Sequence, residues 1–190
     1  MFQRRVVIIG GLGATGRPVL ERLQALSVEA VPASRRTRPA FDWGDRATWP
    51  AALDGATAAY VTYPPGLGAA AAADDIGTLA GVAAEMGIEH LVLLSVRGRR
   101  RVLRAERSLR AAPLDHTILR TDTTGTVPPD AVASLAVAAL CDAAHLNRTY
   151  EIDRDGGVLV GDPGGREDGG RGRDRQRIPV PVDSAASRSS

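Results

Sequence analysis

Three glycines near the N-terminus are spaced as in a loop that holds phosphate groups. Gly10, Gly13 and Gly16 follow an apolar run directly and have the spacing G-x-x-G-x-x-G. Glycine allows a sharp turn off a strand, lets a phosphate approach the backbone and lets the next helix pack closely. The free N–H groups at the start of that helix attract negative charge. The spacing predicts a pyrophosphate loop that includes Ala14 and Thr15. The alternative is a glycine-rich turn without a ligand.

A second chemical feature follows the next apolar run. A site for NAD usually places Asp or Glu here, on the ribose 2′-hydroxyl. Residues 33–38 read ASRRTR instead and contain no carboxylate. Arginine grips a phosphate with two parallel hydrogen bonds, and serine adds a short hydroxyl donor. We therefore expect NADP(H) in preference to NAD(H), with Ser34 and Arg35 on the 2′-phosphate. The alternative is a solvated basic loop.

The elements that must position these residues alternate along the chain. Short apolar runs predict strands at residues 5–9, 29–34, 58–62, 90–95, 117–120 and 149–152, with a weaker one around 40–43. Amphipathic stretches predict helices at 15–26, 74–86, 103–111 and 130–143. Continuous apolar strands between helices are typical of a parallel sheet that is covered on both faces. The predicted fold is a doubly wound α/β sheet of the Rossmann type.

The composition changes near the C-terminus. Residues 156–190 hold 8 of the 21 glycines and show almost no periodic apolar pattern. We therefore expect a dinucleotide-binding domain over residues 1–155 and a disordered Gly/Arg-rich tail over 156–190.

Composition excludes several classes of protein. Hydrophobic residues make up 44% of 190, enough for a core, and the single cysteine cannot form an internal disulfide. No apolar run approaches the roughly 20 residues that span a bilayer, and the first apolar run is too short for a secretory signal, so we expect a cytoplasmic protein without a membrane partner. A net charge of +2 gives no reason to expect nucleic acid. His90, His116 and His145 lack ligand spacing, so no metal site is predicted.

A series of short motifs runs along the chain in a characteristic order. From the N-terminus they are GGLGATG, the SR pair, FDWGDRATWPAALDG, YVTYPPGL, AAEMGIEHLVLLS, LDHTILR and NRTYEID. This series resembles that of NmrA-like proteins, which belong to the atypical short-chain dehydrogenase/reductase group of NAD(P)-binding Rossmann proteins. The resemblance covers roughly residues 3–153. It implies a dinucleotide held by the glycine loop.

The same resemblance implies roles for four more residues. Asp42 would lie near the adenine, and Tyr63 and Pro64 would line the cofactor. Ser95 would face the nicotinamide as a catalytic hydroxyl that polarises the substrate. Two alternatives stay open: Asp42 is a turn-forming carboxylate, or Ser95 is a strand-end hydroxyl that caps local backbone.

Two departures from the wider superfamily bear on activity. Its usual proton relay is a tyrosine followed four residues later by lysine, but this chain contains no lysine and has no tyrosine in the stretch after Ser95. Only about ten residues, 121–130, occupy the place of a substantial substrate segment.

The leading hypothesis is an oxidoreductase that transfers hydride to a small carbonyl or quinone-type substrate. The alternatives are a non-catalytic NADP(H) sensor and a truncated inactive relative. The Ala-rich helices also leave room for a protein partner or a homo-oligomer.

An arginine cluster lies between residues 97 and 110. Seven arginines occur there, and those at 100, 104 and 107 would share one helical face. They form either a solvated helix surface or a field that attracts an acidic substrate or the cofactor phosphates.

Overall fold

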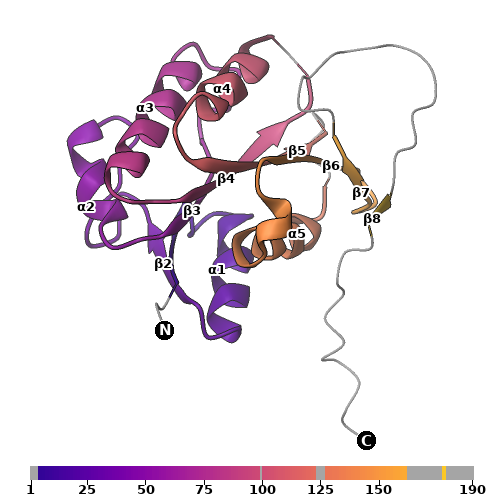
Figure 1. Cartoon of the computed structure of the whole chain (residues 1–190), viewed down its shortest axis with the longest axis horizontal. Helices are drawn as coiled ribbons and strands as arrows, with labels where there is room; N and C mark the ends of the chain where they lie inside the picture. Colours follow the sequence, from indigo (N-terminus) through magenta and orange to yellow (C-terminus); the bar gives the residue numbers. More distant parts are fainter. Residues whose placement is uncertain (1–3, 99, 123–126, 162–176, 179–190) are drawn as a thin grey trace, which may run out of the picture.

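A computed structural model describes residues 4–98, 100–122, 127–161 and 177–178. Its strands form one eight-stranded sheet in the order β2-β1-β3-β4-β5-β6-β7-β8 (Figure 1). The strands are β1 (Arg5–Ile9), β2 (Glu29–Ala33), β3 (Ala58–Val61), β4 (His90–Val96), β5 (Asp115–Thr121), β6 (Arg148–Ile152), β7 (Val158–Val160) and β8 (Arg177–Ile178). β1 to β6 pair in parallel, and β7 and β8 are antiparallel additions.

Helices cover both faces of this sheet. They are α1 (Gly16–Ala25), α2 (Trp49–Leu53), α3 (Ala72–Glu85), α4 (Arg100–Arg110) and α5 (Pro129–Cys141), with short 3-10 turns at Arg46–Thr48 and Ala143–His145. α1 and α5 pack together on one face, whereas α2, α3 and α4 lie on the other (Figure 1). The doubly wound α/β prediction is confirmed. No helix within the described ranges has both the length and the apolar character needed to cross a membrane.

The apolar runs form strands because each strand serves two cores. In β1, Val7 and Ile9 pack against the α2–α4 layer, while Val6 and Ile8 pack against α1 and α5. Alternate residues of a strand point to opposite faces, so a strand covered on both sides must be apolar throughout. This is why the strand ranges expected from the sequence agree closely with those observed.

The strand order places a topological switch point at β1. The connection after β1 leads to β2 on one side, and the later chain returns to β3 on the other side. The carboxyl ends of β1 and β3 are therefore neighbours whose onward connections diverge. In open α/β sheets a crevice forms at such a point, and ligands bind there.

The weaker strand expected around residues 40–43 does not join the sheet. The structure has only an isolated bridge between Asp42 and Asp45 in this region. The Trp49 indole N–H donates to the Asp42 carbonyl oxygen at 2.7 Å, and the Phe41 ring stacks on the Trp49 ring. Residues 41 and 42 thus contact α2 instead of pairing with a strand. The sequence periodicity did not predict this helix.

The sheet continues into the segment assigned to the tail. β7 pairs with β6 in antiparallel register, with Ile152 opposite Val158. The turn between them is closed by Asp153, whose carboxylate accepts the N–H groups of Asp155 and Gly157. β7 has only three residues, too few to show a periodic apolar pattern in the sequence. The sheet therefore extends beyond the domain boundary expected at residue 155. Apart from 156–161 and 177–178, the predicted tail lies outside the described residues.

A buried histidine, His90, is the first residue of β4, at the amino-terminal ends of the parallel strands. His90 is 2% exposed, and its Nε2 lies 2.9 Å from the Thr117 hydroxyl. That hydroxyl donates to the His145 carbonyl oxygen, so it accepts the hydrogen of His90 Nε2. Burial, with a smaller contribution from Arg4, lowers the pKa of His90 to about 4, although the nearby Asp115 opposes the shift. His90 is therefore neutral in the folded protein.

This burial predicts a loss of stability in mild acid. Between pH 6.5 and 4 the unfolded chain protonates His90 and the folded chain does not. The free energy of unfolding should therefore fall by about 3 kcal/mol over that window, with no contribution from His90 above it. Urea titrations at several pH values measure the slope. His90→Gln, which keeps a donor for Thr117, should flatten the slope in part, since burial also lowers the pKa of His116. An unchanged slope in His90→Gln would contradict this account.

Candidate functional site

A cleft of about 900 Å³ opens at the switch point. Three segments enclose it: the glycine loop after β1, the loop after β2 and the start of the loop after β3. The lining residues are Ile9, Gly10, Leu12, Gly13, Ala33, Ser34, Arg35, Arg36, Phe41, Asp42, Trp43, Gly44, Thr62, Pro64 and Pro65. The structure thus brings Gly10, Gly13, Ser34, Arg35, Asp42 and Pro64 of the predicted site together in one cleft.

The glycine loop is shaped by close contacts. Gly10 has φ +85°, and a Cβ placed there would overlap the Thr62 hydroxyl. A Cβ on Gly16, the first residue of α1, would overlap the Gly10 carbonyl group. Gly13 is exposed, and its N–H donates to the Gly10 carbonyl oxygen at 2.8 Å. Gly16 therefore lets α1 approach β1, Gly10 lets Thr62 approach the loop, and Gly13 adds no side chain at the cleft. Ala14 is exposed beside them.

Substitution of Gly10 tests this packing. Gly10→Ala should lower the free energy of unfolding more than Gly87→Ala, because Gly87 has nearly the same φ, +83°, but a Cβ added there would meet no atom within 4 Å. Gly87→Ala measures the cost of the backbone conformation alone, about 1 kcal/mol. The clash with Thr62 should add about 1–3 kcal/mol at Gly10. Urea unfolding of the two variants gives the comparison, and equal losses would mean that the contact with Thr62 imposes no constraint.

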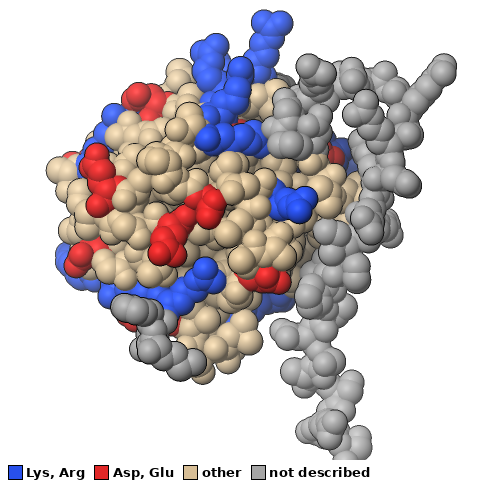
Figure 2. All heavy atoms as spheres, viewed as in Figure 1, with Lys and Arg blue, Asp and Glu red and all other residues tan. Residues whose placement is uncertain are grey.

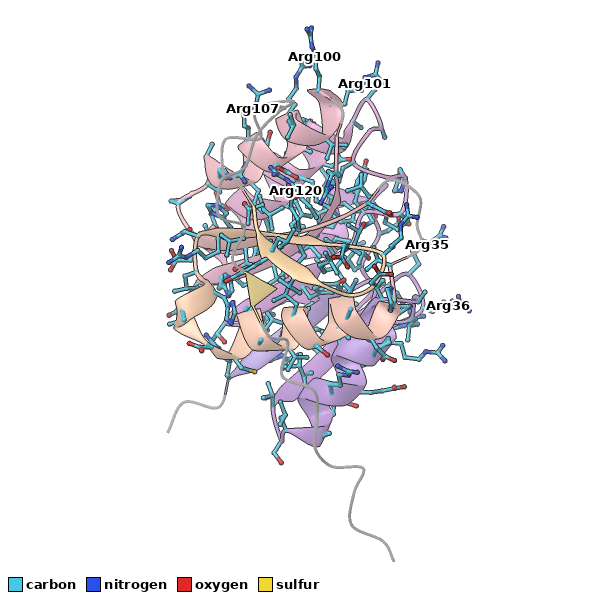
Figure 3. All side chains as sticks on the ribbon, turned by 90° about the vertical axis from the view of Figure 1, so that its right-hand side faces the viewer. Arg35, Arg36, Arg100, Arg101, Arg107 and Arg120 are labelled. Carbon is cyan, nitrogen blue, oxygen red and sulfur yellow. The ribbon has the colours of Figure 1, made fainter. Side chains whose placement is uncertain are left out.

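The loop after β2 presents two arginines at the cleft. The Ser34 hydroxyl accepts the Arg36 N–H at 3.2 Å, and the Thr37 hydroxyl accepts the Ser34 N–H at 2.9 Å. These bonds turn the chain so that Arg35 and Arg36 both project at one edge of the molecule (Figure 3). Within the described residues neither guanidinium has an ion-pair partner. Arg36 was not among the predicted site residues, although the repeated arginine in the sequence is a direct indication of it.

Aromatic side chains form another wall of the cleft. The Trp43 ring meets the rings of Phe41 and Tyr63 edge to face, at centroid distances of 5.1 and 4.8 Å. Asp42 lies between Phe41 and Trp43 and is the only carboxylate in the described lining. One of its oxygens accepts the Gly44 N–H at 2.9 Å. Asp42 therefore closes a turn, as one alternative proposed, and also faces the cleft.

A second cavity, of about 420 Å³, adjoins the cleft and shares Thr62 and Pro64 with it. Its wall combines apolar side chains with hydroxyls. The lining residues are Thr15, Thr62, Tyr63, Pro64, Gly66, Leu67, Gly68, Leu94, Ser95, Val96, Arg97, Val102 and Thr121. Thr15, Tyr63 and Ser95 of the predicted site lie here instead of in the cleft.

Most of the hydroxyls around this second cavity donate to the protein itself. Thr62 donates to the Ile9 carbonyl oxygen at 3.0 Å, and Thr121 donates to the Ser95 carbonyl oxygen at 3.3 Å. Tyr63 donates to the Asp75 carboxylate at 2.6 Å, and burial together with that bond raises the pKa of Tyr63 to about 12. Ser95 is 1% exposed and donates to Glu106 at 2.7 Å. The Ser95 hydroxyl thus binds the buried Glu106 side chain, whereas the alternative reading expected it to bind local backbone.

Glu106 belongs to a buried ion pair that the sequence did not reveal. It is fully buried on α4, and its two carboxylate oxygens accept from Arg120 Nε at 2.9 Å and Nη2 at 2.6 Å. Arg120 is 4% exposed at the end of β5, inside the fold (Figure 3). Arg110 lies 3.6 Å from the same carboxylate. Two features of the sequence could have indicated this pair: Glu106 lies on the apolar face of a helix, and Arg120 lies at the end of an apolar strand.

Removal of one partner should destabilise the protein strongly. Arg120→Met leaves the Glu106 carboxylate buried and poorly compensated, which costs about 3–5 kcal/mol. Adding Glu106→Gln to that variant should restore part of the loss, because the buried charge is removed. Glu29→Gln, which breaks the exposed pair with Arg5, serves as control and should cost at most about 1 kcal/mol. Urea unfolding of the four proteins measures these differences; an equal loss in Arg120→Met and Glu29→Gln would contradict the assigned role.

Fold and cleft define a class: doubly wound α/β proteins with a glycine-loop crevice at the switch point. No family model and no curated protein matches the sequence. Solved structures do match. An NADP(H) complex of a triphenylmethane reductase from Citrobacter sp. is 14% identical, with a TM-score of 0.63 over 77% of this chain and 68% of that one. An anaerobilin reductase from Escherichia coli O157:H7 is 19% identical, with a TM-score of 0.64 over 77% of this chain and 95% of that one.

A third match extends further along this chain. A Rossmann-fold NAD(P)-binding family protein from Shigella flexneri is 14% identical, with a TM-score of 0.65 over 90% of this chain and all of that one. The chain therefore has the fold of NAD(P)-binding Rossmann reductases and epimerases. The narrower NmrA-like resemblance depends on the sequence motifs and stays a prediction.

Proposed function

We propose that this protein binds NADP(H) in the cleft and transfers hydride between the nicotinamide and a small carbonyl or quinone-type substrate in the second cavity. One observation supports the proposal above all. Arg35 and Arg36, unpaired within the described chain, face the same cleft as an intact glycine loop, where an NAD site would carry a carboxylate. The NADP(H) complex of the triphenylmethane reductase is consistent with this cofactor.

The lining residues suit the parts of a dinucleotide. The N–H groups at the start of α1 would hold the pyrophosphate, and the lack of a side chain at Gly13 would let it approach the backbone. Ser34, Arg35 and Arg36 would hold the 2′-phosphate. Asp42 and the Phe41–Trp43 wall would border the adenine. Thr62 and Pro64, which the cleft shares with the second cavity, would guide the nicotinamide toward the substrate.

The protein's own residues then bind and orient the substrate. The cofactor, when bound, supplies a hydride. Four hydroxyls around the second cavity donate their hydrogens to oxygen atoms of the protein, so none of them is placed to give a proton to a substrate. They belong to Thr62, Tyr63, Ser95 and Thr121. A quinone suits such a cavity, because hydride addition gives a delocalised hydroquinone anion that takes its proton from water. The balance is one quinone, one hydride and one proton to one hydroquinone.

The existence of a reductase with this fold supports an enzyme over an inactive relative. The match covers 95% of the anaerobilin reductase. A reductase of similar extent therefore exists with this fold. We propose NmrA-like membership of the atypical short-chain dehydrogenase/reductase group on the sequence motifs.

A non-catalytic NADP(H) sensor is the second candidate. The observation that favours it is the inward donation of four of the five hydroxyls around the second cavity. A sensor needs the cofactor cleft but no acid. Consumption of NADPH over a panel of quinones and aldehydes separates the two functions, since turnover of any quinone identifies an enzyme, whereas tight NADPH binding without turnover identifies a sensor.

The cofactor assignment predicts a difference between NADPH and NADH. NADPH should bind at least about tenfold more tightly, because each charge-assisted bond to the 2′-phosphate contributes about 1.5–3 kcal/mol. Arg35→Ala with Arg36→Ala should remove that preference and leave NADH affinity unchanged. Nicotinamide fluorescence and quenching of tryptophan emission, to which Trp43 in the cleft contributes, measure binding. Arg148→Ala, exposed at β6, is the control. Equal affinities for both dinucleotides in the unmodified protein would overturn the NADP(H) assignment.

A further inference from the structure

The second cavity contains one charged side chain. Arg97 is the only ionised residue in its described lining, which otherwise consists of apolar side chains, glycines and hydroxyls. Leu67, Leu94, Val96 and Val102 supply the apolar part of the wall. A positive charge beside an apolar wall, with no carboxylate in the described lining, creates a favourable potential for a negative group on an apolar molecule.

Arg97 is held in place by neighbouring strands. Its backbone N–H donates to the Thr121 carbonyl oxygen at 2.7 Å, which ties the end of β4 to the end of β5. Its Nη2 donates to the Glu151 carboxylate at 2.8 Å. Arginine has five N–H donors in a planar fork, so one contact orients the group and leaves further donors. The Arg97 side chain remains 44% exposed.

The first turns of α4 add positive charge nearby. This helix contains five arginines and a single glutamate, and that glutamate is the buried partner of Arg120. Basic side chains gather over α4 (Figure 2), and Arg100, Arg101 and Arg107 point away from the fold (Figure 3).

The position of these arginines relates them to the second cavity. Val102 of the same helix lines that cavity. Arg101 and Arg104 border a small hollow with Ala69, Ala70 and Ala73, just after the cavity-lining stretch 66–68. The acidic residues at the start of α3, Asp74 and Asp75, are both paired with Arg46. Because Arg46 offsets part of this negative charge, the start of α3 cancels only part of the positive field of α4 at this side of the molecule.

We propose that the second cavity selects an anionic substrate: an apolar quinone or carbonyl compound that bears a carboxylate or sulfonate group. Arg97 binds that group, and the exposed arginines of α4 raise the local concentration of anions. The same charge favours the hydroquinone anion formed by hydride addition. That the bound anion is a substrate rests on the proposed function, but binding of the anion itself requires no cofactor.

A matched pair of fluorescent probes tests the site directly. 8-Anilino-1-naphthalenesulfonate and N-phenyl-1-naphthylamine share one apolar skeleton and differ in the sulfonate. Titration of the full chain with each, with and without NADP+, should show at least about tenfold tighter binding of the sulfonate, the effect of one charge-assisted contact. Equal affinity for the two probes would overturn the proposal.

Variants locate the site of sulfonate binding. Arg97→Gln should reduce the preference about three- to tenfold and leave the neutral probe unchanged, whereas Arg148→Gln should change neither. Glu151→Gln, which releases Arg97 from its carboxylate, should tighten sulfonate binding about two- to fivefold. This opposite effect keeps the test valid should Arg97→Gln fold poorly, and an unchanged or weaker affinity would count against the proposal. Loss of sulfonate binding only in Arg35→Ala with Arg36→Ala would move the site to the cleft and refute the assignment.

The same samples separate this inference from the proposed function. Arg97→Gln should keep the NADPH affinity of the unmodified protein, because Arg97 does not line the cleft. If NADPH fails to bind and the sulfonate preference still depends on Arg97, the cofactor proposal falls and the anion site stands. If NADPH binds and the preference is insensitive to Arg97, only the anion site falls.

Discussion

The close approach of α1 to β1 is the constraint on which the cleft depends. Gly16 touches the Gly10 carbonyl group, and Gly10 touches the Thr62 hydroxyl at the end of β3. A side chain at either glycine would push α1 or β3 outward and widen the crevice. The same contacts place Thr62, which lines both the cleft and the second cavity. One tightly packed corner therefore determines the shape of the crevice and its connection to the neighbouring space.

Local patterns predicted the parts of the fold that are governed by burial on two faces. β1 is such a part. The glycine spacing was also readable, because Gly16 packs on the nearby Gly10, whereas the contact of Gly10 with Thr62 was not. The aromatic wall around Trp43 was not predictable, since its partners Trp49 and Tyr63 are brought together only by tertiary packing. The same holds for the pair of Glu106 and Arg120, which joins a helix to a strand. Ser95 illustrates the limit: its position at the strand end could be read from the sequence, but the direction of its hydroxyl could not.

The buried carboxylates of α3 and α4 near the second cavity are used to hold the fold together. Glu106 accepts from both Ser95 and Arg120, so a carboxylate near the cavity is neutralised by packing contacts. Asp75 likewise accepts from Tyr63 and Arg46. Such bonds fix the orientation of the side chains and compensate for their burial. In the proposed reductase, the dinucleotide would therefore supply the hydride and the solvent would supply the proton.

The chain contains no lysine, so all 24 of its basic side chains, Arg35, Arg36 and Arg97 included, are guanidinium groups. A guanidinium does not lose its proton at any pH at which a protein of this kind stays folded. The positive charge of these arginines is consequently constant across the whole working range. Any change in ligand affinity with pH must then come from the ligand, from carboxylates beside the arginines or from the stability of the fold, and never from loss of the arginine charge.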